Sequence, residues 1–277
     1  MSPAADETLI EAGRPERHYW QEAWRLRELL LFLSWRDIVV RYRHTAIGVA
    51  WAVIKPLLTV TIFTVIFGWV ARLPSEGESP YALMVLAGLL PWLFFASMVN
   101  DAGNSLLNNE RIVTRTYFPR ILVPGSAIAV CLVDFLVSGV VLAGAFAWYG
   151  VAPDARVLAL PAFVLLAVLV GAGPALLLSA LNVRFRDVRF VVPFVIQIGL
   201  YVSPVGFSSV LVPEPWRLIY SLNPMAGVID GFRWSLLGGN SQLYWPSLAL
   251  SVAISIAFLW AGLRYFRATE RQIADVI

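Results

Sequence analysis

Positively charged and hydrogen-bonding side chains crowd into one short stretch of the chain, just ahead of its first long apolar segment. The stretch holds Arg41, Tyr42, Arg43 and His44, and Lys55 follows within the apolar segment. Arginine forks and a tyrosine hydroxyl suit a phosphate or pyrophosphate head group at a membrane surface. Positive charges beside an apolar segment also act as orientation signals, but orientation does not require these residue types to be adjacent. We therefore predict that these five residues bind an anionic head group.

Two ionisable residues lie inside apolar segments. At the helical rise of about 1.5 Å per residue, Lys55 lies about 12 Å beyond Ile47 and Asp134 lies about 15 Å beyond Pro124. An ionisable side chain at that depth is costly and indicates a function. Lys55 either extends its ammonium back to the membrane surface, supports the head-group site or pairs with Asp134. Asp134 is alternatively a protonated acid or a hydrogen-bonding group between helices.

The sequence lacks the residues of familiar enzymatic and cofactor chemistry. One cysteine, Cys131, and two distant histidines, His18 and His44, provide neither a disulfide framework nor a cluster of metal ligands. No glycine-rich phosphate loop ending in Lys and Ser or Thr occurs, so we do not expect the chain itself to hydrolyse nucleotides. The apolar segments also lack the series of acidic and histidine side chains of a proton relay. We expect a chain that is not an enzyme and binds no cofactor or metal.

The elements that carry these residues are those of a membrane protein. Of the 277 residues, 59% are hydrophobic and 14% are charged, and the mean hydropathy is +0.73. Soluble domains have about 45–50% apolar and about 25% charged residues. The composition therefore excludes a soluble enzyme, a disordered protein and a nucleic-acid-binding protein, and it predicts an all-α protein with several membrane-spanning helices.

A helix needs ~20 mostly apolar residues to cross about 30 Å of hydrocarbon, and six segments qualify. They cover residues 47–71, 81–99, 122–149, 157–181, 190–208 and 243–265. We therefore predict a six-span domain over 47–265, preceded by an N-terminal region, 1–46, and followed by a tail, 266–277.

Basic residues are distributed unevenly between the two sides of this predicted bundle. Sixteen arginines lie in the N-terminal region, after the second and fourth segments and toward the C-terminus, whereas four lie on the opposite side. Because positively charged loops stay in the cytoplasm, we expect both termini to be cytoplasmic. The net charge of +3 and the pI near 9.2 follow from this asymmetry and require no nucleic-acid partner.

Two segments on the predicted cytoplasmic side are not simple spans. Residues 18–35 place tryptophans on one helical face and charged residues on another, which is typical of a helix lying in the plane of the membrane interface. The stretch that follows, residues 36–56, carries the Arg41 cluster. The loop 100–121 has room for a short helix near 105–115 that ends before Pro119. Such a helix either docks onto a soluble partner or is a plain connector.

The segment 208–242 is too apolar for a solvated loop. Asn223 is a suitable N-cap and Pro224 suits the first position of a helix. We expect two short helices, near 215–222 and 224–237, that enter the membrane and return. Such backbone is tolerated where protein covers it or where it lines a cavity, so it favours a transport path. The residues predicted to form the outer gate of this path are Trp216, Asn223, Pro224 and Phe232.

Several short motifs along residues 34–240 resemble the membrane subunits of ABC type-2 polysaccharide exporters, such as those for O-antigen, capsule and teichoic acid. The motifs are Arg36-Asp37, Arg41-Tyr42-Arg43, Gly48-x-x-Trp51, Gly88-Leu89-Leu90-Pro91-Trp92, Phe94-Phe95, Tyr117-Phe118-Pro119-Arg120, Leu181-Asn182-Val183, Phe185-Arg186-Asp187-Val188, Ser203-Pro204-Val205 and Asn223-Pro224-Met225. Each motif alone is weak, but their order, spacing and coverage of the chain make the resemblance specific.

The resemblance implies a fold, partners and a substrate. The fold has an interface helix, a gate segment, six spans, a coupling helix between spans two and three, and two re-entrant helices on the outer side. The chain would form a homodimer in the bacterial inner membrane with two separate ATP-binding subunits, which carry ATP and Mg²⁺. The substrate would be a polysaccharide such as O-antigen, linked to undecaprenyl pyrophosphate, whose head group the Arg41 cluster would bind.

Two further groups of site residues are predicted, the first from the resemblance and the second from the chemistry of aromatic rings and sugars. Contact with the ATP-binding subunits is assigned to the segment that contains Glu110, Arg111, Tyr117, Phe118, Pro119 and Arg120. Aromatic rings can pack against sugar rings while a polymer slides past them. This role along the glycan path is assigned to Trp92, Phe94, Phe95 and Tyr201.

Three other functions remain as alternatives. An exporter of a lipid, teichoic acid or small amphiphile shares the topology, but an outer domain or a fused nucleotide-binding domain would be expected. An intramembrane glycosyltransferase needs acidic catalytic or metal-binding motifs in its loops. A secondary transporter needs coupling-ion residues or an inverted repeat. The sequence displays none of these features, so polysaccharide export is the favoured interpretation.

Overall fold

The computed structural model describes residues 19–43, 46–77, 79–185, 187–239 and 241–276, and every regular element in them is a helix. This confirms the predicted all-α fold. Five helical stretches are long and apolar enough to cross a membrane, and they correspond to five of the six predicted spans. The elements in these stretches are α3 (Ala46–Phe63) with the π-helix η1 (Thr64–Val70), α4 (Tyr81–Asn108), α6 (Leu122–Tyr149), the 3-10 helix η2 (Ala155–Ala159) with α7 (Leu160–Arg184), and α11 (Trp245–Val276).

The predicted fifth span, 190–208, is only partly helical. Its helix, α8 (Val188–Val202), has 15 residues. At about 1.5 Å per residue this is about 22 Å, which is shorter than a hydrocarbon core of about 30 Å. The helix ends because Ser203 is extended, with φ −81° and ψ 153°, and Pro204 disfavours helical geometry in the residue before it. The structure thus confirms a helix here but not a span of full length.

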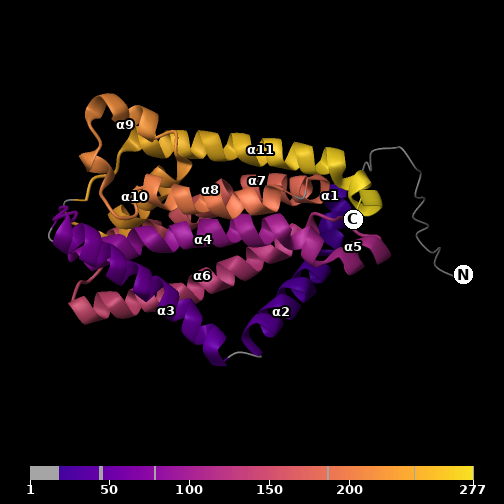
Figure 1. Ribbon diagram of the computed structural model, residues 1–277, viewed down its shortest axis with the longest axis horizontal. Helices are drawn as coiled ribbons and strands as arrows, with labels where there is room; N and C mark the ends of the chain where they lie inside the picture. The colour runs from indigo at the N-terminus through magenta and orange to yellow at the C-terminus, as the bar shows by residue number, and fades with distance from the viewer. Residues whose placement is uncertain (1–18, 44–45, 78, 186, 240, 277) are drawn as a thin grey trace, which may run out of the picture.

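Helix α4 lies within the bundle, packed against α6 and α7, and α11 packs along α7 (Figure 1). All residues from 83 to 90 of α4 are buried, as expected of a helix that is apolar on every face. Gly173 of α7 and Gly262 of α11 bring these two helices into backbone contact. A Cβ added to Gly262 would lie 2.4 Å from the carbonyl oxygen of Gly173, an approach that only small residues allow.

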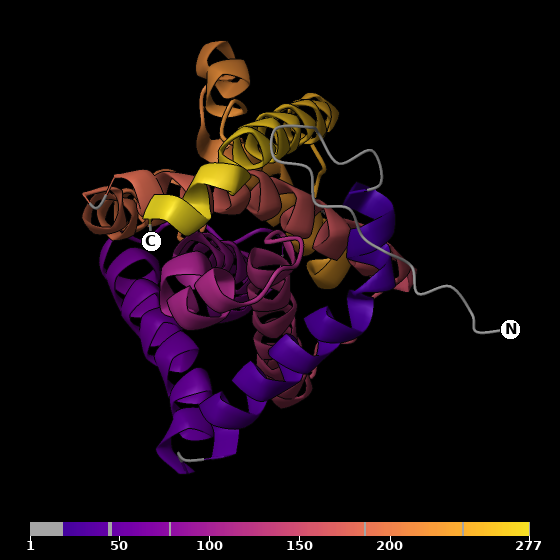
Figure 2. The same cartoon turned by 90° about the vertical axis from the view of Figure 1, so that its right-hand side faces the viewer.

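Helices α2 (Arg27–Arg43) and α3 diverge from this bundle (Figures 1 and 2). The ends at which they follow one another in the chain lie away from α7 and α11 in both views. The predicted interface helix, 18–35, is divided at Leu26 into α1 (Tyr19–Arg25) and α2, and α2 continues through the gate segment. The exposed side chains on α1 and α2 include Trp20, Trp24 and Trp35.

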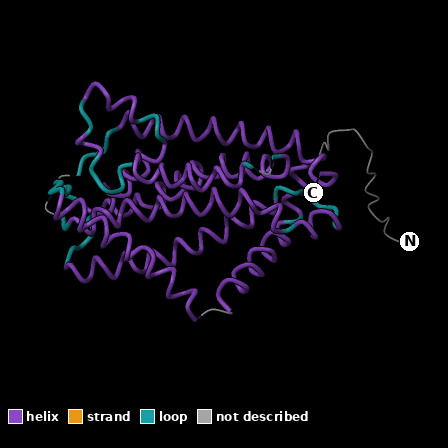
Figure 3. The backbone as a smooth tube through the Cα atoms, viewed as in Figure 1, coloured by secondary structure: helices purple, strands orange, loops and turns teal. Residues whose placement is uncertain are grey.

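Most loops gather at the two ends of the bundle (Figure 3). One end holds α1, α5 (Glu110–Arg115) and the C-terminal part of α11 (Figure 1). We call it the arginine-rich end, because it carries residues such as Arg111, Arg120 and Arg267. The predicted helix 105–115 is divided at Asn109, whose φ of −113° interrupts the helix between α4 and α5.

The opposite end holds two short helices that the sequence predicted. They are α9 (Glu214–Tyr220) and α10 (Pro224–Leu237), preceded by the 3-10 turn η3 (Ser209–Leu211). Helix α9 projects from the bundle in both views, whereas α10 packs against α4, α7 and α11 (Figures 1 and 2). The apolar character of 208–242 is therefore explained mainly by the burial of α10.

Candidate functional site

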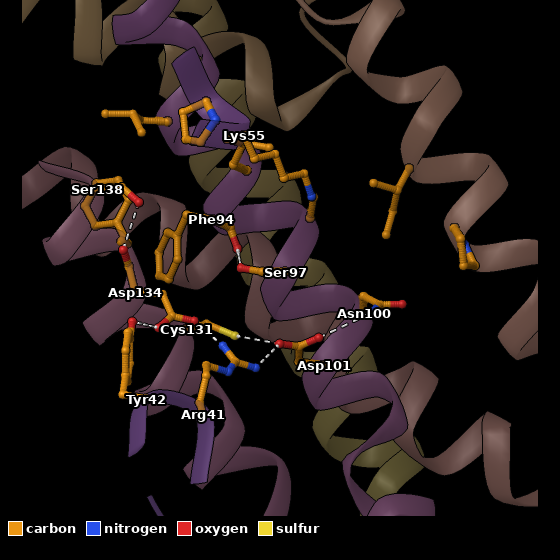
Figure 4. Close-up of a pocket in the computed structure, with 17 residues that line it drawn as sticks. Arg41, Tyr42, Lys55, Phe94, Ser97, Asn100, Asp101, Cys131, Asp134 and Ser138 are labelled. Atoms are coloured by element: carbon orange, nitrogen blue, oxygen red, sulfur yellow. Dashed lines mark hydrogen bonds and ion pairs between the residues drawn. The ribbon is translucent and has the colours of Figure 1, made fainter. Parts of the chain in front are cut away.

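A cavity of about 700 Å³ lies between α2, α3, α4, α6 and α8 (Figure 4). Its wall combines apolar side chains, such as Leu93 and Phe94, with a cluster of polar ones. The polar and charged side chains on the wall are Arg41, Tyr42, Lys55, Ser97, Asn100, Asp101, Asp134 and Ser138. Three members of the predicted head-group site, on two different helices, thus face one cavity.

Arg41 connects three helices at this cavity. Its Nη2 lies 2.8 Å from Oδ2 of Asp101 on α4, and its Nη1 pairs with Oδ2 of Asp134 on α6. The side chain of Arg41 is 41% exposed, against 31% for Asp101 and 24% for Asp134. Although partial burial lowers the pKa of Arg41, the hydrogen bond to Asp101 and the charge of Asp134 outweigh it and raise that pKa. The guanidinium is therefore a charged bridge from α2 to α4 and α6.

Each of these two carboxylates also has a second donor. The hydroxyl of Tyr42 donates to Oδ1 of Asp134, and the amide of Asn100 donates to Oδ1 of Asp101 over 3.2 Å. Burial, followed by the hydrogen bond to Asp134 and its charge, raises the pKa of Tyr42 to about 12. The Tyr42 hydroxyl consequently remains a donor at neutral pH.

Lys55 faces the same cavity from α3. Within the described part of the chain it forms no ion pair, so of the three alternatives for Lys55 the structure does not show the pairing with Asp134. Arg41 and Tyr42 occupy the two oxygens of Asp134 instead, which makes Asp134 a hydrogen-bonding group between helices. Arg43 is exposed at the end of α2 and is not part of the cavity wall, and His44 lies outside the described residues.

The aromatic residues predicted to line a glycan path do not converge. Phe94 lines the cavity, whereas Trp92 is buried in the core and packs on Phe95 at a centroid distance of 5.4 Å. Tyr201 is exposed on α8, and its ring lies parallel to that of Phe63 within 9°. Phe94 is thus the member of this group that the cavity contains, and the role of the others stays a prediction.

The residues predicted to contact an ATP-binding subunit divide into exposed and internal ones. Glu110 and Arg111 on α5 are exposed, and so is Tyr117. Phe118 and Pro119 are buried, and Phe118 packs in a cluster at the arginine-rich end. Only the first three side chains therefore face outward in this chain.

Arg120 connects the predicted coupling segment, residues 110–120, to the last helix, α11. Its backbone N–H donates to Oε1 of Glu270 over 2.7 Å, and its Nη1 donates to the backbone carbonyl of Glu270. The hydroxyl of Tyr19 donates to the same Oε1 over 3.0 Å, and Arg267 lies 4.2 Å from the centre of the Tyr19 ring. Burial, then the charge of Glu270, raises the pKa of Tyr19. Helix α1, the coupling segment and α11 are thus joined here.

The predicted outer-gate residues at the opposite end lie in different environments. Trp216 is exposed on α9, whereas Phe232 is buried on α10. Asn223 caps α10, because its Oδ1 accepts a hydrogen bond from the backbone N–H of Met225 over 3.1 Å, and Pro224 occupies the first turn. The helix start predicted at Asn223 is therefore confirmed.

A second arginine site, centred on Arg233 of α10, was missed in the sequence. Its side chain is 0% exposed, and its Nη1 lies 3.2 Å from Oε1 of Glu76. Three backbone carbonyls accept its N–H groups, those of Met84 at 3.2 Å, Phe207 at 2.9 Å and Val205 at 2.8 Å. Its position inside an apolar stretch was the available signal, since arginine is almost never fully buried unless it is paired.

Asp230, one turn before Arg233, is also buried. Its Oδ2 accepts a hydrogen bond from the hydroxyl of Ser209 over 2.7 Å, while its Oδ1 has no partner within the described residues. Burial raises the pKa of Asp230 to about 6, although Ser209 and Arg233 act in the opposite direction.

A family model described as ABC-2 type transporter matches residues 28–237, which include both arginine sites. The chain belongs to this family. Membership of a transporter family, together with five helices of spanning length, identifies it as a multi-pass membrane protein. The resemblance seen in the sequence motifs is thereby confirmed at the level of the family.

Individual relatives extend the similarity beyond the family model. The O-antigen export system permease protein RfbA of Klebsiella pneumoniae is 28% identical over 253 residues, which cover 91% of this chain and 96% of that protein. The protein of the same name from Myxococcus xanthus is 26% identical over 259 residues, covering 93% and 98%. The inner membrane transport permease YadH of Escherichia coli strain K12 is 23% identical over 213 residues, covering 74% and 83%.

Proposed function

We propose that the chain is the permease subunit of an ATP-driven exporter that moves a lipid-linked polysaccharide, such as O-antigen, across the bacterial inner membrane. One observation carries the proposal. The similarity to two permeases named for O-antigen export covers more than nine tenths of this chain and of each relative. The cavity beside α2 supports it, because cationic side chains and an apolar wall together suit a lipid with an anionic head group.

The proposed topology has six crossings and cytoplasmic termini. Helix α8 and the turn after it would complete the fifth crossing, and α9 and α10 would be the re-entrant helices. An even number of crossings returns the chain to its starting side. In keeping with this, α1 and the C-terminal part of α11 lie at the same end of the bundle (Figure 1). The excess of arginine at that end supports a cytoplasmic location for it.

Two copies of the chain would form the path together with two ATP-binding subunits, which supply the ATP and Mg²⁺. The exposed residues Glu110, Arg111 and Tyr117 would contact those subunits at the arginine-rich end. Phe118, Pro119 and Arg120 would act differently, by passing movement of α5 into the bundle. The hydrogen bonds from Arg120 to Glu270 support this role, because they connect the segment that follows α5 to α11.

The pyrophosphate of the carrier lipid would bind at the cavity, through Arg41, Tyr42 and Lys55, with Arg43 and His44 beside them in the sequence. The glycan would follow a path that includes Phe94, with Trp92, Phe95 and Tyr201 as further candidates. The outer gate would comprise α9 and α10, where Trp216 is the exposed member and Phe232 the buried one. Asn223 and Pro224 would hold the angle between these two helices.

The experiment that tests this proposal follows the glycan in cells. Deletion of the gene should remove the polymer from the cell surface and leave lipid-linked glycan at the cytoplasmic face, and the intact gene should restore export. Co-purification with the ATP-binding subunit encoded nearby should give a complex whose ATPase rate rises with lipid-linked glycan. Normal surface glycan in the deletion strain would refute the proposal.

A second candidate is an exporter of a lipid, teichoic acid or small amphiphile. The largely apolar wall of the cavity also fits such a substrate. Stimulation of the purified complex by an amphiphile without a glycan, and not by lipid-linked glycan, would favour this alternative.

A further inference from the structure

The bridge formed by Arg41 (Figure 4) lies near the C-terminal end of α2, the end at which α2 and α3 follow one another away from α7 and α11 (Figure 1). Arg41 is the third residue from the C-terminal end of α2, which ends at Arg43. Its two ion pairs hold this end of the helix against α4 and α6. Removing the guanidinium from Asp101 and Asp134 breaks both ion pairs and leaves the weaker hydrogen bond from Tyr42 to Asp134, so it loosens α2 over the cavity.

The two carboxylates can release the guanidinium because other donors are available to them. Asp101 keeps the amide of Asn100, which lies on α4 beside it. Asp134 keeps the hydroxyl of Tyr42 only until α2 moves, because Tyr42 lies on α2, and water then takes its place. A carboxylate that loses one donor but retains another avoids much of the cost of an unsatisfied polar group. The side chains of Arg41, Asp101 and Asp134 are also partly exposed, so water can solvate them while Arg41 changes partners.

A phosphate group can replace the two carboxylates because two of its oxygens can accept from Nη1 and Nη2 of Arg41, the nitrogens that now contact Asp134 and Asp101. Arginine binds carboxylate and phosphate oxygens in the same bidentate manner. Lys55 faces the cavity from α3 and supplies a second cation for the same ligand. Before the exchange, the charges of Arg41 and Lys55 balance those of Asp101 and Asp134. After it, the phosphate and the two carboxylates repel one another.

We propose that Arg41, Asp101 and Asp134 form a ligand-released latch, in which the pyrophosphate of the substrate lipid takes Arg41 from the two carboxylates and frees the end of α2. The repulsion between the bound pyrophosphate and the carboxylates then moves α2 away from α4 and α6. This inference rests on the proposed function and adds to it the event that opens the cavity. The same step, in which Arg41 exchanges the two carboxylates for the pyrophosphate, thus both recognises the head group and opens the cavity.

Cys131 provides a native reporter for the latch. It is the single cysteine of the chain and is 1% exposed, and its thiol lies 3.9 Å from Oδ2 of Asp101 on the cavity wall. Opening of α2 should expose it to N-ethylmaleimide. The whole chain in lipid nanodiscs is labelled with and without farnesyl pyrophosphate, a short polyprenyl pyrophosphate. The labelling rate should rise by roughly tenfold with this ligand, since the rate follows the fraction of open molecules.

Three variants separate the latch from a general loosening of the protein. The double variant Asp101→Asn with Asp134→Asn should label rapidly without ligand and gain nothing further from farnesyl pyrophosphate. Arg41→Lys, which keeps the charge but not the fork, should label at an intermediate rate. Asp37→Asn is the matched control, because Asp37 pairs with its neighbour Arg36 on α2 itself at 2.7 Å. This control should behave as the wild type.

Two further ligands identify which part of the lipid acts. Inorganic pyrophosphate that accelerates labelling would support the latch and assign its release to phosphate chemistry alone. Farnesol that accelerates labelling as much as farnesyl pyrophosphate would overturn it. A wild-type rate in both the double variant and Arg41→Lys would also overturn it, as would slower or unchanged labelling of the wild type with farnesyl pyrophosphate. Export of glycan is measured separately in cells, so failure of the latch is distinguishable from failure of the proposed function.

Discussion

Two arginines are held at different places in this molecule and by different kinds of partner. Arg233 is 0% exposed and is held by Glu76 and three backbone carbonyls. Arg41 is 41% exposed and is held by the carboxylates of Asp101 and Asp134. A backbone carbonyl within a packed segment cannot turn toward a new donor, whereas both carboxylates around Arg41 already have one. The comparison teaches that the contacts of Arg233 suit a permanent link between packed segments, whereas those of Arg41 suit a link that can open. We call them the permanent joint and the joint that opens.

The largest effect should follow from removing the permanent joint. Arg233→Met leaves Glu76 and three carbonyls without their cation, and we expect the free energy of unfolding to fall by about 3–5 kcal/mol. The measurement is denaturant unfolding of the purified chain in mixed micelles. Arg156→Met is the control, because Arg156 also lies at that end but reaches two carbonyls only at 3.3 and 3.5 Å. Equal losses in both variants would abolish the distinction between a buried and a surface joint.

The free energy of unfolding should also depend on pH, because Asp230 is buried one helical turn before Arg233. The groups that act on Asp230 are Ser209, Arg233, Glu76 and Arg217. Its pKa is about 6 in the folded chain, above the ordinary value of 3.8, so the folded state binds the proton more tightly than the unfolded state. The contribution of Asp230 to the free energy of unfolding is therefore present at low pH. It is lost as the pH rises from about 4 to about 6, and the loss should be about 1–3 kcal/mol.

Unfolding curves at a series of pH values measure this effect as the difference between the wild type and Asp230→Asn. The variant cannot ionise at this position, so its stability should lack this component of the pH dependence. The same slope in both proteins between pH 4 and 6 would show that another group is responsible.

A smaller effect should follow from crowding the same joint. A Cβ added at Gly88 would lie 3.0 Å from Nη2 of Arg233 and 3.1 Å from Cγ2 of Ile229. Gly88→Ala should therefore lower the free energy of unfolding by about 1–2 kcal/mol, as expected for overpacking of a filled site. Gly139→Ala on α6 is the matched control, because among the described residues no atom beyond its chain neighbours and the backbone of its own helix lies within 4 Å of the added carbon. A stabilised Gly88→Ala would mean that Arg233 can shift after all.

The smallest effect on stability should come from the joint that opens. Asp134→Asn removes one charge from Arg41 but leaves Asp101 in place, and the pair is partly exposed. We expect a change below about 1 kcal/mol in the free energy of unfolding. Thermal unfolding of the purified chain measures it. A loss as large as that of Arg233→Met would show that Arg41 is a second permanent joint.

The sequence predicted the long helices well because their signals are local. Apolar length and arginine count require no knowledge of neighbours, and they located five spans and the helix pair that begins at Glu214 and Pro224. The shortness of α8 was harder to predict, because the residues after Ser203 remain apolar while the backbone leaves the helix.

The partners of the charged residues depend on the packing of distant helices. Arg41 lies 60 positions from Asp101 and 93 from Asp134, so no local spacing connects them. The sequence indicated that Arg41 and Asp134 are functional candidates, but it did not connect them, and it left Lys55 as one possible partner of Asp134. Arg233 was counted as an outer charge for the same reason. Its carbonyl partners are backbone atoms, which no residue type marks.

The hydrogen bond between Tyr19 and Glu270 has a consequence for the order of events during biosynthesis. It joins positions that are 251 residues apart, and Arg120 shares the same carboxylate. Helix α1 leaves the ribosome long before α11, since synthesis proceeds from the N-terminus. Neither Tyr19 nor Arg120 can reach its partner until α11 has been translated and inserted. A stalled chain would therefore lack the carboxylate that joins α1 and the segment after α5 to α11, so this end of the bundle becomes complete only when the last helix is in place.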